Sequence, residues 1–320
     1  MSQNRSVRQS RFDLPPYSNT GGKSCPRSRI DWLSFSWPLA ELEPRQMLGL
    51  LRSWLCVTVQ IEDSGRGYLG FKSRLDLVAT VGGQKVVLGL VAWGGESQRE
   101  RGYVSLTGAG CSTIRPALWP LVQKGLERIK AKLTRVDIAV DDLDGVFGVE
   151  TCVEWYQAGR FTSNGRPPSH SLLGAWLVPD GKGRTIYVGR RENGKMLRCY
   201  EKGKQLGNPA SPWVRWEVEL RSVDRVIPLA VVSDPDGFFV GAYPALGEVL
   251  AVSARRIEVE KRERTHTVES LTYWARRAYG RLVDVLLSEL DGDYGAVVDC
   301  LRVRGIPRSL ARTFLRAEPR

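Results

Sequence analysis

Residues 134–142 read Thr-Arg-Val-Asp-Ile-Ala-Val-Asp-Asp, and this stretch decides the fold class. Successive side chains of a β-strand point to opposite faces of the sheet. Arg135, Asp137 and Asp141 therefore share one face, while the valines and the isoleucine between them occupy the other. Such alternation is typical of a strand that buries one face against a core and leaves the other polar.

Two later stretches alternate in the same way. In residues 214–221, the side chains of Arg215, Glu217 and Glu219 share one face. In residues 196–202, those of Arg198, Tyr200 and Lys202 share one face. Carboxylates on two strands concentrate negative charge unless a cation joins them, and hard oxygen ligands suit Mg²⁺ or Mn²⁺. From this pattern alone, a metal site and a ladder of surface ion pairs between strands both remain open.

The third stretch sets a phenol between two cations. That setting favours a phenolate and attracts phosphate, so Tyr200 is a candidate nucleophile. The alternative is a tyrosine that only packs against its neighbours.

The rest of the chain predicts an α+β domain followed by a helical segment. Apolar, β-branched and aromatic runs predict further strands at residues 30–37, 57–62, 75–81, 85–93, 103–107 and 185–189. Apolar spacing of three and four predicts helices over residues 118–133, 149–157 and 269–290. We expect a flexible basic tail at 1–28, one domain at 29–252 and a helical C-terminal segment at 253–320.

Composition narrows the classes of function. The 320 residues carry 47 Lys and Arg against 35 Asp and Glu, a net charge of +12, which indicates a polyanionic partner such as nucleic acid. The chain has two histidines, which excludes sites built on paired histidine ligands, and six dispersed cysteines, which fit a reducing cytosol. No apolar run is long enough to span a membrane and no secretory signal precedes the domain. We expect a soluble cytoplasmic protein without membrane contact.

The sequence resembles the replication initiation factor family of filamentous phages, rolling-circle plasmids and integrative elements. The matching segments occur in family order at residues 30–33, 104–111, 134–142, 187–191, 197–204 and 214–221. The resemblance implies a nicking domain built on an antiparallel sheet with helices packed on one face.

The resemblance also implies roles for the polar residues. Tyr200 of the Arg-x-Tyr-x-Lys stretch would attack an origin phosphodiester, leaving a 5′-phosphotyrosine link and a 3′-hydroxyl primer, and would later rejoin the ends. The residues expected to assist are Arg198, Lys202 and Arg215 at the phosphate, Asp137, Asp141 and Glu217 at a Mg²⁺ or Mn²⁺ ion, and Glu219 beside them.

Origin recognition requires contacts beyond the nick. Candidates are the basic tail, the Arg-rich segment from Arg255, and the side chains Lys124, Arg128, Lys130, Arg190 and Arg191. Phosphate contacts give affinity without sequence information, so base-reading residues are not predicted. The C-terminal helices fit a dimerisation role equally well. The expected partners are origin DNA, single-stranded or extruded as a hairpin, with a host helicase and a second copy of the chain as further candidates.

Three alternatives stay open at this point. A non-catalytic repressor or copy-control protein would bind DNA without cutting it. A hydrolytic two-metal nuclease would use Asp137, Asp141, Glu217 and Glu219 and leave no protein-linked DNA. A relaxase of an integrative element would carry out the same chemistry as a replication initiator.

Overall fold

The computed structural model describes residues 28–81, 83–98, 100–162, 165–223, 225–250 and 268–304. Contacts along the chain divide it into two compact units, with the boundary between Lys261 and Arg262. Residues 28–250 belong to the first unit, and residues 268–304 belong to the second.

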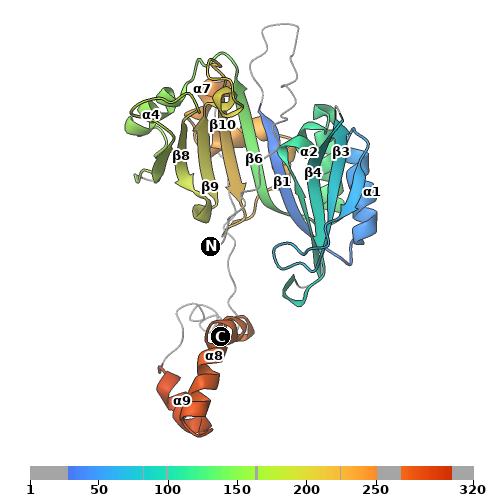
Figure 1. Cartoon of the computed structure of the whole chain (residues 1–320), viewed down its shortest axis with the longest axis vertical. Coiled ribbons are helices and arrows are strands. Elements are labelled where there is room, and N and C mark those ends of the chain that lie inside the picture. The colour runs from blue at the N-terminus through green and yellow to red at the C-terminus, as the bar shows by residue number, and fades with distance from the viewer. Residues whose placement is uncertain are drawn as a thin grey trace, which may run out of the picture. The chain divides into compact units, whose positions relative to one another are not determined.

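Within the described part of the first unit, ten strands form one antiparallel sheet in the order β2-β3-β4-β5-β1-β6-β10-β9-β8-β7 (Figure 1). The strands are β1 (Arg29–Pro38), β2 (Gln60–Asp63), β3 (Ser73–Val81), β4 (Gln84–Trp93), β5 (Arg101–Leu106), β6 (Lys132–Asp142), β7 (His170–Leu173), β8 (Thr185–Arg190), β9 (Lys195–Tyr200) and β10 (Val214–Arg221). The predicted antiparallel α+β architecture is confirmed.

Within this unit, five described helices lie between these strands and two follow the last strand, β10. They are α1 (Pro44–Trp54), α2 (Gly108–Ser112), α3 (Trp119–Arg128), α4 (Val149–Gln157), α5 (Lys202–Gln205), α6 (Pro235–Ala242) and α7 (Leu246–Leu250). Single 3-10 turns occur at Glu96–Gln98, Pro116–Leu118, Arg191–Asn193 and Leu229–Val232. None of the described helices is long and apolar enough to cross a membrane.

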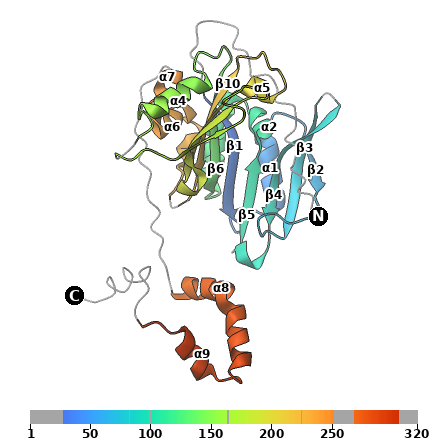
Figure 2. The same cartoon turned by 60° about the vertical axis from the view of Figure 1, so that its left-hand side comes forward.

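The helices pack on one face of the sheet. Buried side chains of α1, α2, α3, α4, α6 and α7 form a single apolar cluster with the core-facing strand residues. Trp54 of α1 packs on Phe35 of β1, and Trp155 of α4 packs on Trp216 of β10, with ring centroids 6.4 and 5.5 Å apart. Figure 2 shows α4, α6 and α7 gathered on one side of the sheet.

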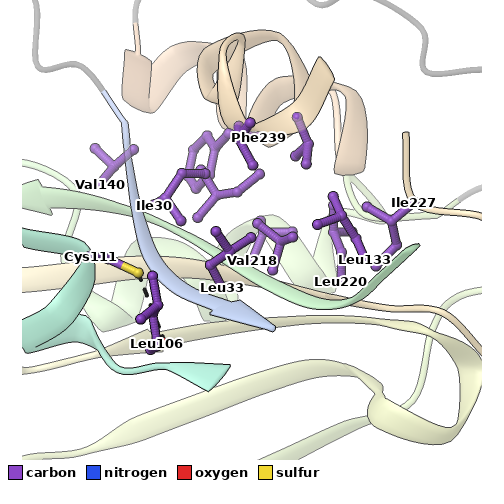
Figure 3. Close-up of a cluster of buried hydrophobic side chains, with 14 of the residues drawn as sticks. Ile30, Leu33, Leu106, Cys111, Leu133, Val140, Val218, Leu220, Ile227 and Phe239 are labelled. Atoms are coloured by element: carbon purple, nitrogen blue, oxygen red, sulfur yellow. Dashed lines mark hydrogen bonds between the residues drawn. The ribbon is translucent and has the colours of Figure 1, made fainter. Parts of the chain in front are cut away.

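The centre of this core lies between β1, β6 and α6. Figure 3 shows Phe239 of α6 beside Ile30, with Leu33 and Val218 beneath the helix. These side chains are buried, and burying a large apolar side chain stabilises the fold by about 1.5–3 kcal/mol. The apolar members of each alternating stretch thus hold β1, β6 and β10 against the helices.

Strand register fixes what lies on the opposite face. In β6 and β10, Asp137 lies opposite Glu219, Ala139 opposite Glu217, and Asp141 opposite Arg215. In β10 and β9, Glu217 lies opposite Arg198 and Arg215 opposite Tyr200. Cross-strand partners share a face, so the polar members of the three predicted strands meet on three adjacent strands in the middle of the sheet.

The second unit contains α8 (Val268–Glu289) and α9 (Tyr294–Leu301). The Asp293 side chain caps α9 by accepting a hydrogen bond from the Ala296 backbone N–H at 3.1 Å. The helix predicted at residues 269–290 is confirmed within one residue at each end.

Candidate functional site

Tyr200 ends β9 and lies on the polar face, 3% exposed. Its hydroxyl group lies 3.3 Å from Nη2 of Arg198 and 3.5 Å from Oε2 of Glu217. The Arg198 guanidinium lies over the Tyr200 ring, 4.3 Å from its centroid. The ring is therefore not part of the core on the helical side. It belongs to a polar cluster contributed by β9 and β10.

Arg198 and Glu217 form the central ion pair of this cluster. Nη2 of Arg198 donates to both carboxylate oxygens of Glu217, at 2.9 and 2.7 Å. Nε of Arg198 is buried and has no hydrogen-bond partner among the described residues. The guanidinium therefore has one unused donor next to the tyrosine. Leaving a buried donor unpaired costs about 1–3 kcal/mol, so a partner at this position would be favourable.

The environment raises the pKa of the Tyr200 phenol above its usual value. Burial is the main cause and the Glu217 charge adds to it, and together they outweigh the opposing charges of Arg215 and Arg198. The expectation that flanking cations would favour a phenolate was therefore wrong for this state of the protein. Tyr200 is protonated at neutral pH and needs a base to become a nucleophile.

The sequence predicted that Lys202 shares a strand face with Arg198 and Tyr200, and this prediction was wrong. β9 ends at Tyr200, and Lys202 begins the short helix α5. The chain turns at Glu201, whose carboxylate accepts hydrogen bonds from the Arg184 backbone N–H at 2.7 Å and from Nζ of Lys204 at 2.7 Å. Lys202 is nevertheless close to Tyr200, with Nζ 5.8 Å from the centroid of its ring.

Asp137 is a buried carboxylate on the neighbouring strand. It accepts a hydrogen bond from Nε of Arg135 at 2.8 Å. Burial, with the charges of Glu217 and Glu219, raises its pKa to about 7 despite the Arg135 contact. Burial is thus the main reason that Asp137 holds its proton more tightly than an exposed aspartate does.

Glu219 is surrounded by cations. Nε of Arg191 donates to it at 2.9 Å, Arg221 forms a second ion pair, and Arg135 lies 3.7 Å away. Burial opposes ionisation, yet the charges of Arg135, Arg221 and Arg191 lower the pKa of Glu219. Glu219 thus links β10 to Arg191 and Arg135 through ion pairs.

Asp141 lies in a separate group. Nε of Arg215 donates to it at 2.8 Å, Nε1 of Trp213 donates at 2.7 Å, and Arg29 pairs with it at 3.0 Å. Arg215 also contacts Asp31 at 3.2 Å and is only 1% exposed. Because four residues of strand span about 13 Å, Asp141 lies well along β6 from Asp137.

Asp31 was not predicted as a site residue. A register shift in β1 between Ile30 and Trp32 leaves Asp31 as an extra residue and turns its side chain toward Arg215. Simple alternation assigns Asp31 and Trp32 to opposite faces. A bulge has no reliable sequence signature, so only the coordinates reveal this contact.

The predicted three-carboxylate metal set does not converge. Among the described residues, no group of three or more His, Cys, Asp or Glu side chains is arranged to hold a metal ion. Asp137 and Glu217 lie near each other, and Asp141 belongs to the Arg215 group. Mg²⁺ usually takes one or two carboxylates together with substrate phosphates and waters, so the donor chemistry of the first two fits such an ion.

The predicted DNA-contacting residues occupy different places. Arg191 lies next to Glu219 at the polar face, and Arg190 is exposed at the end of β8. Lys124 and Arg128 lie on α3, whose buried residues belong to the core on the helical side. There they line a pocket with Leu50, Ser53, Trp54, Leu118, Leu121 and Gly125.

Lys130 is not on the predicted helix. α3 ends at Arg128, and Lys130 adopts a φ of +50° in the turn that leads to β6. Its Nζ pairs with Glu41 at 2.6 Å. Residues 1–27 of the basic tail, and residues 255–267 and 305–320 of the segment that starts at Arg255, lie outside the described residues.

A family model described as replication initiation factor matches residues 131–298, more than half of the 320-residue chain. The chain belongs to the replication initiation factor family. The match starts just before β6 and includes β8, β9 and β10, so Asp137, Tyr200 and Glu217 all lie within it. Strands β1 to β5 precede it.

The fold agrees with this assignment. The structure is similar to the rolling circle replication initiator protein from Geobacillus stearothermophilus, with a TM-score of 0.54 and 18% sequence identity over 72% of this chain and 99% of that one. At this identity the likeness shows a shared fold. No curated protein matches the sequence.

Proposed function

We propose that this replication initiation factor starts rolling-circle synthesis by nicking one origin strand with Tyr200. The observation that carries the proposal is the Tyr200 hydroxyl, which has Arg198 at 3.3 Å and the carboxylate Glu217 at 3.5 Å on one polar face. A nucleophile, a base and a phosphate-binding cation are the parts that this reaction requires.

In the proposed step, Oη of Tyr200 attacks the scissile phosphorus. The Oη–P bond forms while the bond from phosphorus to the 3′-oxygen breaks. The phenol proton passes to Glu217, and the departing 3′-oxygen takes up a proton to become the primer hydroxyl. The phosphotyrosine link retains the free energy of the cleaved bond, so the reverse reaction rejoins the ends.

Arg198 and Arg215 stabilise the charge that develops on the phosphate. The unpaired Nε of Arg198 supports this role, because a bound phosphate oxygen would give that buried donor a partner. Lys202 adds positive charge near the ring, with Nζ 5.8 Å from its centroid.

Asp137 and Glu217 are the residues proposed to hold Mg²⁺ or Mn²⁺. A divalent ion at this place would supply positive charge to a non-bridging phosphate oxygen. Two carboxylates on adjacent strands of one sheet face support this assignment, because oxygen ligands of this kind suit Mg²⁺ or Mn²⁺.

The test is covalent capture of DNA. The protein is incubated with Mn²⁺ and 3′-end-labelled single strands from the DNA flanking its gene, then run on a denaturing gel. We expect a labelled band at the combined mass of protein and DNA, lost in Tyr200→Phe and retained in Tyr187→Phe, the matched control on the adjacent strand. An adduct that persists in Tyr200→Phe would exclude Tyr200 as the nucleophile.

One observation favours a second function. Asp137, Asp141, Glu217 and Glu219 all pair with arginines, which suits a rigid DNA-binding surface without catalysis. A copy-control protein of this kind would bind origin DNA and leave it intact in both Mg²⁺ and Mn²⁺. Released product without protein linkage would instead indicate a hydrolytic nuclease. A host helicase and a second copy of the chain are the further partners we propose.

A further inference from the structure

A second apolar cluster lies on the polar face of the sheet, away from the helices. It consists of Tyr68, Phe71, Leu90, Ala92 and Tyr103. The Tyr103 ring stacks on Tyr68 and on Phe71, with centroids 5.8 Å apart and interplanar angles of 29° and 26°. This cluster is separate from the core that holds the sheet to its helices.

Strand register places the cluster on the same face as Tyr200. Ser34 lies opposite both Arg135 of β6 and Ser105 of β5, and its hydroxyl lies 2.9 Å from that of Ser105. Tyr103 is two residues from Ser105 and therefore shares that face. With strands about 4.8 Å apart, β5 lies about 10 Å from β6, the strand of Asp137.

Trp32 lies on the same face, beside the carboxylate site of β6. It lies opposite Asp137 in the register of β1 and β6, and the Arg135 guanidinium lies 4.5 Å from the centroid of its ring. Arg135 in turn pairs with Asp137. Trp32 and the stacked tyrosines thus lie on one face of the sheet, with Tyr103 opposite Ser36, four residues along β1 from Trp32.

The rings are only partly covered. Trp32, Tyr68 and Tyr103 are each intermediate in exposure, whereas Phe71 is buried beneath them. Arg74 lies 5.5 Å from the centroid of the Tyr68 ring, and Lys72 is exposed beside it. Half-exposed aromatic rings with adjacent cations match what unpaired bases and their phosphates require.

We propose that Trp32, Tyr68 and Tyr103 form a stacking platform for unpaired bases of the DNA strand that flanks the scissile phosphate. The inference rests on the proposed nicking function for its placement, although the binding itself requires no cleavage. A duplex is a poor occupant, because paired bases are stacked on each other and their faces are inaccessible. All three platform residues precede residue 131 and so lie outside the family match.

The test measures binding in a cleavage-deficient background. Full-length Tyr200→Phe protein is titrated against labelled oligo(dT) and against an oligo(dA)·oligo(dT) duplex of the same length, with fluorescence anisotropy as the readout. Stacking on aromatic rings tolerates any base, so oligo(dT) is an adequate probe. The test variant is Tyr68→Leu with Tyr103→Leu, and the matched control is Tyr279→Leu, an exposed tyrosine of the second unit.

We expect the double variant to bind oligo(dT) at least about 30-fold more weakly, since it loses two stacking contacts that are each worth about 1–3 kcal/mol. Its affinity for the duplex should stay within twofold. Equal losses on both probes, or no loss on oligo(dT), would overturn the platform. Failure of wild-type protein to form a covalent adduct would instead contradict only the proposed nicking function.

A second measurement covers the case in which the leucine variant does not fold. Tyr68→Phe with Tyr103→Phe keeps the rings and should bind oligo(dT) as tightly as its parent. Photocrosslinking of the Tyr200→Phe parent with 5-iodouracil in the oligonucleotide should label Trp32, Tyr68 or Tyr103. Crosslinks found only on α3 or in the second unit would overturn the proposal.

Discussion

The hydroxyl of Tyr200 lies 3.5 Å from Oε2 of Glu217, on the strand next to its own. Burial raises the pKa of the phenol, and the charge of Glu217 adds to the rise. In the proposed mechanism Glu217 also takes the phenol proton, so attack by Tyr200 would require bound DNA.

Glu217→Gln should slow adduct formation by about 10²–10⁴-fold, because it removes the proposed general base. The remaining rate should rise with pH, since hydroxide must then take the phenol proton. Initial rates of adduct formation with 3′-labelled DNA measure both effects. Glu192→Gln, an exposed acid on the turn before β9, is the control and should react as the wild type does. A Glu217→Gln rate within twofold of wild type would remove Glu217 from the mechanism.

Arg215→Met should destabilise the first unit by about 3–5 kcal/mol, because Asp141 and Asp31 then lose a buried cation. Arg215→Lys should recover only part of this loss, since an ammonium group cannot contact both carboxylates with a planar fork. Urea unfolding gives the free energies, and exposed Arg190→Met is the matched control. A loss below 1 kcal/mol in Arg215→Met would show that the cluster adds little to stability.

Glu201 should give the stability of the first unit a measurable acid dependence. Burial opposes its charge, but hydrogen bonds from Arg184 and Lys204 lower the pKa of Glu201 to about 2 from 4.5. A carboxylate whose pKa is lower in the folded state stabilises the fold, and the full contribution is present at pH values above its pKa in the unfolded chain. The contribution is lost as the pH falls toward its pKa in the folded protein.

The measurement compares urea unfolding of wild type and Glu201→Gln across this range. We expect the wild type to be more stable by about 1–3 kcal/mol near neutral pH, from its charge-assisted hydrogen bonds. The difference should shrink as pH falls from about 4.5 to about 2. A difference that stays constant over that range would show that the Glu201 charge does not tie β9 to Arg184.

The sequence predicted which strands form the site better than it predicted the residues at which those strands end. Alternation identified β6, β9 and β10 with the correct faces, and the bounds of α4 and β10 match the structure. Polar and apolar residues must segregate in a half-buried strand, so this signal is strong. The end of β9 depends on Glu201 bonding to Arg184, a long-range contact without a local signal.

The remaining errors have similar causes. Helix α1 and strand β7 were not predicted; β7 is short and exposed, and α1 is held by long-range packing of Trp54 on Phe35. Carboxylates that share a face were expected to converge, but register sets Asp137 and Asp141 on opposite sides of the Ala139–Glu217 pair. Periodicity determines which face a side chain occupies, whereas the distance along that face depends on pairing.

Lys124→Ala with Arg128→Ala should separate origin binding from cleavage. Both residues lie on α3, on the helical side of the sheet, whereas Tyr200 lies on the opposite face. We expect adduct formation with a short single strand to stay within twofold of wild type. If α3 contacts the phosphates of a longer duplex origin, the affinity of the variant for that duplex should fall. The slope of log K against log salt should also become less steep by about 1.8, which is 0.9 for each lost phosphate contact. Lys85→Ala, exposed on β4, is the control for a general loss of charge. Unchanged duplex affinity and salt slope would assign origin binding to other parts of the chain.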